Sequence, residues 1–102
     1  MAAQAAIELA EQAKAAGDLS ELEAKMRANP GDHQARFDLG VAQFAAGRRE
    51  EAIDHLLELF RTARAWNDDA ARKQMVKFFE VLGPTHALTI ASRKRLSSLM
   101  FR

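Results

Sequence analysis

Cysteine is absent from the 102-residue chain, and proline (2) and glycine (5) are scarce. Without cysteine the chain forms no disulfide, performs no thiol chemistry and offers no thiolate ligand to a metal. The absence fits a reducing compartment. Few helix-breaking residues, together with abundant alanine, favour helices over strands.

Long apolar runs and a dominant sign of charge are also missing. In the opening MAAQAAIELAEQA, Glu8 and Glu11 interrupt the sequence before the apolar run of a signal peptide or a membrane span develops. The formal charge of +1 indicates no overall attraction to nucleic acid or to an anionic membrane. We therefore expect a cytoplasmic location. Since the chain begins inside a helical pattern, we also expect it to be part of a longer protein.

Apolar residues at three- and four-residue spacing predict six helices within a single domain, residues 1–102. No stretch alternates apolar and polar residues for long enough to predict a strand. The expected helix starts are about Ala3, Asp18, Asp32, a position after Gly47, Asn67 or Asp68, and Thr85. The expected ends are marked by Gly17, Pro30, Gly47 and Gly83, with the fourth helix passing Phe60 and the sixth running nearly to Arg102.

The short connections between these helices predict three antiparallel hairpins. Two of the glycine turns also resemble each other, since AKAAGDLSELEAKM and AQFAAGRREEAIDHL share Ala-Ala-Gly, polar residues and an amphipathic helix. Gly17 and Gly47 lie 30 residues apart, which is in the range of helical repeats. The pattern predicts an all-α fold in which antiparallel helix hairpins form a short solenoid.

Residues 36–59 resemble the central part of the tetratricopeptide repeat motif. Leu39 and Gly40 match its Leu-Gly pair, Gly47 its turn, Ala52 its small position and Leu56 its large apolar position. Small residues at Gly40 and Ala52 let two helices approach closely, while Leu39 and Leu56 are expected to fill the seam between them.

Some positions depart from that motif. Arg36 and Gln43 stand where aromatic residues are usual, and Arg64 stands at the closing proline. The 30-residue spacing is also about one helical turn shorter than the repeat of roughly 34 residues. The chain therefore resembles a divergent repeat.

A longer resemblance covers most of the chain. The segments DHQARFDL, AGRREEAIDHLLEL, WNDDAARKQM and RKRLSSLMF, in that order, resemble the C-terminal helical region of bacterial thioredoxin-like co-chaperones, the chaperedoxin family. The resemblance implies that a thioredoxin domain precedes this chain in the full-length protein. It also implies holdase activity toward unfolded clients and contact with the GroEL-type chaperonin through the last helix. In RKRLSSLMF the residues that would take part are Leu96, Leu99, Met100 and Phe101.

The last helix carries two apolar stripes on a helical wheel. The stripe expected to face inward consists of Leu88, Leu96, Leu99 and Met100. Ile90 and Phe101 fall together on another face, with Lys94 beside them and with Arg95 and Arg102 adding to a basic end. Such a ridge is typical either of a docking helix or of a residue pair that caps a solenoid.

Reactive groups are sparse elsewhere. His55 shares a helix face with Glu51 and Glu58, a spacing that suits metal ligands or an acid–base pair, although an exposed face of ion pairs is the favoured interpretation. No serine elbow or phosphate loop is present. We therefore expect no enzyme activity, cofactor or metal. Phe37, Phe44, Phe78 and Phe79 are expected in the core, whereas Trp66 either staples a turn or marks an interaction surface.

Three functions fit these observations. The favoured one is a protein-interaction module that binds unfolded clients or the GroEL-type chaperonin. The alternative is a structural or oligomerising solenoid. A nucleic-acid-binding helical domain, based on Arg93, Lys94 and Arg95, is the least favoured because the net charge is so small.

Overall fold

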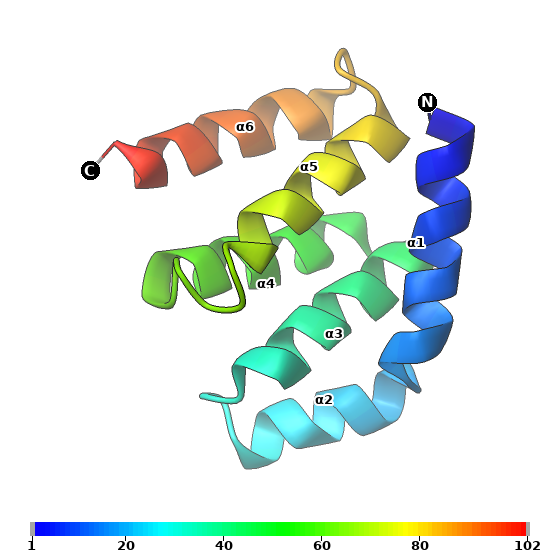
Figure 1. Cartoon of the computed structure of the whole chain (residues 1–102), viewed down its shortest axis with the longest axis vertical. Helices are drawn as coiled ribbons and strands as arrows, with labels where there is room; N and C mark the ends of the chain where they lie inside the picture. The colour runs from blue at the N-terminus through cyan, green and yellow to red at the C-terminus, as the bar shows by residue number, and fades with distance from the viewer. Residues whose placement is uncertain (1, 102) are drawn as a thin grey trace.

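The computed structural model describes residues 2–101, and all of their regular secondary structure is helical (Figure 1). Its six helices are α1 (Ala2–Ala16), α2 (Leu19–Ala28), α3 (His33–Ala45), α4 (Arg49–Thr62), α5 (Ala70–Leu82) and α6 (Ala87–Met100). The all-α solenoid of about six helices that the sequence predicts is confirmed. Among the described residues, no helix combines the length and the apolar character needed to cross a bilayer.

Local chemistry explains several of the helix ends. The Asp32 side chain caps α3, as predicted, because its Oδ1 accepts a hydrogen bond of 3.0 Å from the backbone N–H of Ala35. Gly17, Gly47 and Gly83 follow α1, α3 and α5 with φ angles of 114°, 92° and 97°. These are conformations that glycine adopts without a steric penalty.

The start of α6 differs from the prediction. The cap is His86 rather than Thr85, and its Nδ1 accepts a hydrogen bond of 3.1 Å from the backbone N–H of Leu88. Residues 84–86 form the turn that follows Gly83, so the helix begins one residue later than the threonine predicts. A neutral imidazole serves here as the acceptor that a hydroxyl usually supplies.

The connection between α4 and α5 contains an unusual left-handed turn. Asn67, Asp68 and Asp69 have φ angles of 48°, 57° and 64°, so α5 begins only after them, later than the sequence predicts. Asn and Asp tolerate this conformation better than other non-glycine residues. Trp66 packs this turn against α3, with its ring 5.7 Å from Phe37 and 6.2 Å from His33. Of the two interpretations of Trp66, the structure supports the staple.

The helices pack mainly in chain order, with one exception. α3 and α4 form the central hairpin, α2 lies against α3, α5 lies against α4, and α6 contacts both α4 and α5. The expected hairpin of α1 with α2 does not form, because α1 turns away at Gly17 and packs across α3 and α5 (Figure 1). The array is therefore curled. Its radius of gyration, 12.8 Å, matches the roughly 13 Å of an ordinary globular domain of this size.

The core divides into two clusters. The larger one lies among α3, α4 and α5, and in it the rings of Phe44 of α3 and Phe78 of α5 stack with centroids 4.0 Å apart. Its buried members are Leu9, Val41, Phe44, Ala52, Ile53, Leu56, Leu57, Leu59, Phe60, Ala71, Met75, Phe78, Phe79 and Leu96. The smaller cluster joins α2 to α3 and consists of Leu22, Met26, Ala35, Leu39 and Ala42. The phenylalanines predicted for the core lie in the larger cluster or, for Phe37, pack against it.

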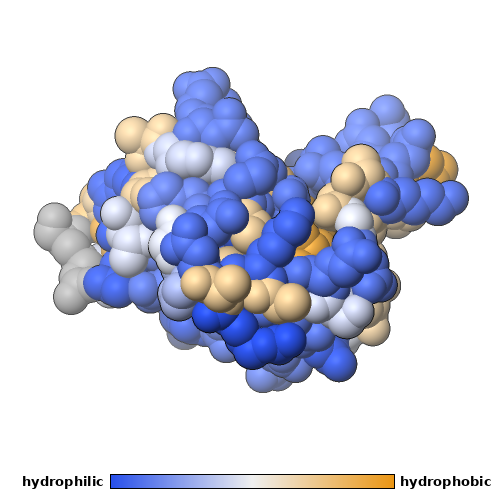
Figure 2. Space-filling model, turned by 90° about the horizontal axis from the view of Figure 1, so that it is seen from below, coloured by the Kyte–Doolittle hydropathy of each residue, from blue (hydrophilic) through white to orange (hydrophobic). Residues whose placement is uncertain are grey.

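Charged side chains cover much of the remaining surface. Figure 2, which views the molecule from below Figure 1, shows a largely hydrophilic face with apolar patches between the charges. The apolar spacing of the sequence predicts that Ala6, Leu9, Ala10 and Ala13 form the inward stripe of α1. In the structure Ala5 and Leu9 are buried, whereas Ala6 and Ala10 are exposed. The rotation follows from the packing of α1 on two helices at once, since neither of them is its neighbour in the chain.

Candidate partner-binding surface

The outer face of α6 presents two large apolar side chains to solvent. Ile90 is 47% exposed, and Phe101, which follows the last helical turn, is 82% exposed. Lys94 is also exposed and lies on the same face by helical spacing. Arg102, the remaining residue predicted for this surface, lies outside the described residues. We call Ile90, Lys94 and Phe101 the α6 ridge.

The inward face of α6 is more polar than the sequence predicts. Leu96 is buried and Leu88 and Leu99 are partly buried, as expected, but Met100 is 39% exposed. Thr89 and Ser92 take its place in the interior, with 0% and 1% exposure. Both fall on the wheel between or beside the inward leucines, so the packing of α6 on α4 and α5 buries them as well. Hydrophobicity alone did not identify them.

Most of the basic residues near the ridge are engaged within the molecule. Arg95 donates a hydrogen bond of 2.7 Å to Asp54 of α4, and the Arg93 guanidinium lies 5.7 Å from the centre of the Phe79 ring. Arg64, at the end of α4, donates to the Leu99 carbonyl at the C-terminal end of α6. The predicted basic edge of the ridge is therefore narrower than the sequence indicates, because Arg95 is turned toward α4.

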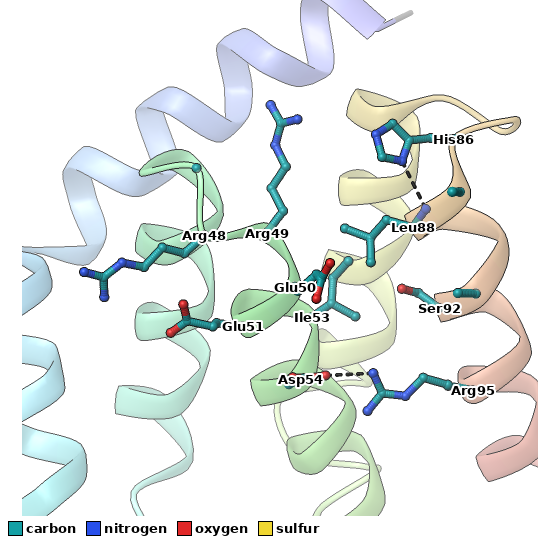
Figure 3. A pocket seen from close by; sticks show the side chains of 13 residues that line it. Arg48, Arg49, Glu50, Glu51, Ile53, Asp54, His86, Leu88, Ser92 and Arg95 are labelled. Carbon is teal, nitrogen blue, oxygen red and sulfur yellow. Dashed lines mark hydrogen bonds and ion pairs between the residues drawn. The ribbon is translucent and has the colours of Figure 1, made fainter.

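A groove runs between α4 and α6 and was not anticipated from the sequence. Its first part, of about 900 Å³, lies between the N-terminal halves of the two helices, and Figure 3 shows its side chains. Ile53 and Ser92 lie at its base, and charged side chains line its sides. The Arg95–Asp54 ion pair separates it from a second part of about 450 Å³ toward the C-terminal ends. The groove depends on how far α6 stands from α4, and no sequence pattern encodes that separation.

The residues predicted to pack the repeat lie mostly at the contact between α3 and α4. A Cβ placed on Gly40 would lie 3.2 Å from Cδ2 of Leu56 and 3.4 Å from the Ala52 carbonyl oxygen. Ala52 and Leu56 are fully buried, and Gly47 forms the turn between the helices. Leu39 does not fill this seam. It belongs to the smaller cluster and packs between α2 and α3.

His55 is half-buried and pairs with a cation. The guanidinium of Arg36 approaches to 3.2 Å from Nδ1 of the imidazole, an arrangement in which Arg36 donates and the neutral ring accepts. Burial lowers the pKa of His55, and the positive charge of Arg36 lowers it further. Glu58, the residue expected beside it, instead forms hydrogen bonds with Arg61. Within residues 2–101, no three His, Cys, Asp or Glu side chains gather closely enough to hold a metal ion.

Comparison with known proteins agrees with this geometry. A family model described as tetratricopeptide repeat matches residues 12–101, from the end of α1 through α6. The chain belongs to the tetratricopeptide repeat family. Neither the curated proteins nor the solved structures contain a significant match to it. Tetratricopeptide repeats are protein-interaction modules in which stacked helix pairs present an extended binding surface.

Proposed function

We propose that the chain is the interaction module of a thioredoxin-like co-chaperone, and that the α6 ridge binds unfolded clients or the GroEL-type chaperonin. The exposure of Phe101, at 82%, is the observation that carries the proposal. The sequence resemblance of RKRLSSLMF to the last helix of chaperedoxins supports the chaperonin as the partner. In the full-length protein a thioredoxin-like domain would precede α1.

The ridge has the composition of a small interface centre. Aromatic side chains are enriched among the residues that dominate binding energy, and charged residues at the rim contribute mainly to the rate of association. Ile90 and Phe101 would supply the apolar contact, with Lys94 beside them. Burial of one such aromatic residue contributes about 2 kcal/mol, which corresponds to roughly thirtyfold in affinity.

Nucleic acid is a poorer partner for this surface. Nucleic-acid binding was suggested by Arg93, Lys94 and Arg95. Two of these three residues already have partners within the molecule, since Arg95 pairs with Asp54 and Arg93 lies over the ring of Phe79. A phosphate backbone requires several free cations, and its affinity falls steeply with salt. Binding through the α6 ridge would depend only weakly on salt, since most of its contact area is apolar.

The variant Phe101→Ala tests the proposal directly. We expect its affinity for purified GroEL-type chaperonin, or for urea-unfolded citrate synthase, to fall about thirtyfold in a titration. Its melting temperature should stay within about one degree of the native chain, because an exposed side chain contributes little to folding. Ile7→Ala is the matched control, since Ile7 is another exposed apolar residue, 62% exposed, on α1. Unchanged affinity of Phe101→Ala for both probes would contradict the proposal and leave Phe101 as a terminal cap.

A further inference from the structure

The groove between α4 and α6 lies apart from the apolar residues of the α6 ridge. Its lining residues come from α4, from α6 and from the turns that precede these helices. Of the α6 ridge, Lys94 lines the second part of the groove, whereas Ile90 and Phe101 line neither part. α1 lies elsewhere, across α3 and α5. A partner can therefore occupy the groove while every helix stays in place and while Ile90 and Phe101 remain exposed.

The first part of the groove has an apolar floor with one hydroxyl group in it. Ile53 is fully buried and Leu88 is partly buried. Ser92 is 1% exposed, and in Figure 3 its hydroxyl oxygen points toward α4, without a hydrogen-bond partner among the described residues. A nearly buried hydroxyl without a partner is unfavourable, and a peptide group that bonds to it removes this cost. The floor therefore suits an aliphatic side chain with backbone beside it.

One unpaired charge lies at each part of the groove. Glu50 of α4 lines the first part, and Lys94 of α6 lines the second. Both are exposed, and neither takes part in an ion pair among the described residues. A ligand with a basic group at one end and an acidic group at the other would pair with both residues.

The arginines beside Glu50 are directed away from the groove. Arg48 forms an ion pair of 3.4 Å with Glu23 of α2, and the guanidinium of Arg49 lies 5.5 Å from the centre of the Phe44 ring. Figure 3 shows both side chains extending away from α6, whereas the carboxylate of Glu50 lies close to the groove floor. The acceptor that a ligand meets in the first part is therefore Glu50.

The ion pair across the groove selects an extended ligand over a helical one. Arg95 and Asp54 lie 2.7 Å apart and separate the two parts. A helix is about 10–12 Å wide and would have to break this pair in order to lie along the groove. An extended chain can pass over the pair, since its side chains on one face are about 6–7 Å apart and enter on either side of it. The remaining N–H groups of Arg95 can donate to a backbone carbonyl of such a chain.

We propose that the groove binds an extended segment of a partner protein. Two aliphatic side chains, two positions apart, enter the two parts of the groove, a basic residue before them pairs with Glu50, and an acidic residue after them pairs with Lys94. The shortest segment with this pattern has the form Lys-Val-Thr-Val-Asp. The proposal does not depend on the chaperonin as a partner, because its apolar contacts are made by Ile53, Leu88 and their neighbours rather than by the α6 ridge.

A labelled peptide that contains Lys-Val-Thr-Val-Asp tests the groove directly. We expect saturable binding to the full chain in a fluorescence anisotropy titration. In nuclear magnetic resonance spectra of the chain, the backbone amide signals of Ile53, Ala91 and Ser92 should shift as the peptide is added. Absence of saturable binding at millimolar concentrations of the chain would overturn the proposal, and so would shifts confined to residues outside α4 and α6.

A bulky side chain at the rim should block the site. Ala91 is exposed on α6 and lines the first part of the groove, so the side chain of Ala91→Arg would fill it. Affinity for the peptide should fall at least about tenfold, because the aliphatic side chains lose their place. Ala24→Arg, the same substitution at an exposed alanine of α2, is the matched control and should bind as the native chain does. Equal affinity of the two variants would overturn the proposal.

A second peptide, Asp-Val-Thr-Val-Lys, tests the two charges. It has the same composition with the charges exchanged, so the native chain should bind it about fivefold more weakly, the effect of one exposed ion pair. Glu50→Lys should reverse this preference. If each chain binds the two peptides equally, the assigned charge pairs and the direction of the segment are wrong.

Sedimentation equilibrium without peptide separates a partner protein from a second copy. The native chain should be a monomer, and a dimer that Ala91→Arg abolishes would assign the groove to another copy and overturn the partner assignment. The groove and the α6 ridge also fail separately. Phe101→Ala should lose chaperonin affinity but bind the peptide as the native chain does, and equal loss of peptide binding in Phe101→Ala and Ala91→Arg would overturn the groove as a distinct site.

Discussion

α4 and α6 are both 14 residues long, and each is the second helix of its hairpin, yet they bury very different side chains. α4 buries six apolar residues, namely Ala52, Ile53, Leu56, Leu57, Leu59 and Phe60. α6 buries Leu96 together with the hydroxyl residues Thr89 and Ser92. The neighbouring helices explain the contrast, since α4 lies against α3, α5 and α6, whereas among the described residues α6 packs mainly on α4 and α5.

The difference in buried side chains distinguishes α4, a helix of the core, from α6, a helix with an apolar outer face that could bind a partner. A helix that commits its apolar residues to the core, as α4 does, has none left for a partner. α6 keeps Ile90 and Phe101 outside. It also buries Thr89, whose Oγ1 has no hydrogen-bond partner among the described residues, and such a buried group costs roughly 1–3 kcal/mol. α6 is therefore the less strongly attached of the two helices and the better placed to dock.

The same substitution in both helices gives the largest expected effect. Leu56→Ala should destabilise the fold by about 4–5 kcal/mol and Leu96→Ala by about 2–3 kcal/mol, since Leu56 is fully enclosed and Leu96 is near the surface. Urea unfolding of both variants measures the difference. Equal losses would show that α6 is as much a part of the core as α4, and the contrast between the helices would not hold.

Close packing between α3 and α4 provides the next test. Gly40→Leu should cost about 1–3 kcal/mol, because the new side chain would overlap Leu56 and the Ala52 carbonyl. Ala45→Leu, on the exposed end of the same helix, is the control and should change stability little. Thermal melting of the two variants should separate them, and a Gly40→Leu chain as stable as the control would place the tight contact elsewhere.

The ion pair between the two helices should matter less. Asp54 and Arg95 are both exposed, and exposed pairs contribute about 0.2–1 kcal/mol. A double-mutant cycle with Asp54→Ala and Arg95→Ala, followed by urea unfolding, measures their coupling. A coupling well above about 1 kcal/mol would mean that α6 is held to α4 chiefly by charge, contrary to the modest role assigned to the pair.

The smallest effect concerns pH and His55 on α4. Burial and the neighbouring Arg36 lower the pKa of His55 below its ordinary value of 6.5. The folded state then binds a proton at His55 more weakly than the unfolded state does. The contribution of neutral His55 to the stability of the fold is therefore complete above pH 6.5, and it is lost as the pH falls from 6.5 to the lowered pKa of the folded state. Between about pH 7.5 and about pH 5 the native chain should lose slightly more thermal stability than His55→Gln. Identical pH dependence of the melting temperature in the two chains would show that protonation of His55 does not affect the stability of the fold.

The amino-acid sequence alone determined the helices and several of their ends. Glycine at Gly17, Gly47 and Gly83 and the carboxylate of Asp32 act within a few residues, so their effects are visible without a fold. The outward position of Ile90 and Phe101 could also be predicted from the sequence, because an α-helix has 3.6 residues per turn whatever it packs against.

Tertiary structure decided which helix faces meet. The sequence predicts that α1 pairs with α2, yet α1 packs across α3 and α5, where Leu9 reaches the core cluster that contains Phe44 and Phe78. Burial of Thr89, exposure of Met100 and the groove beside α4 likewise follow from where α6 lies. Helix formation depends on residues that are neighbours along the chain, so it can be predicted from one sequence. Burial depends on contacts between residues that are distant in the sequence, and these contacts are much harder to predict from one sequence.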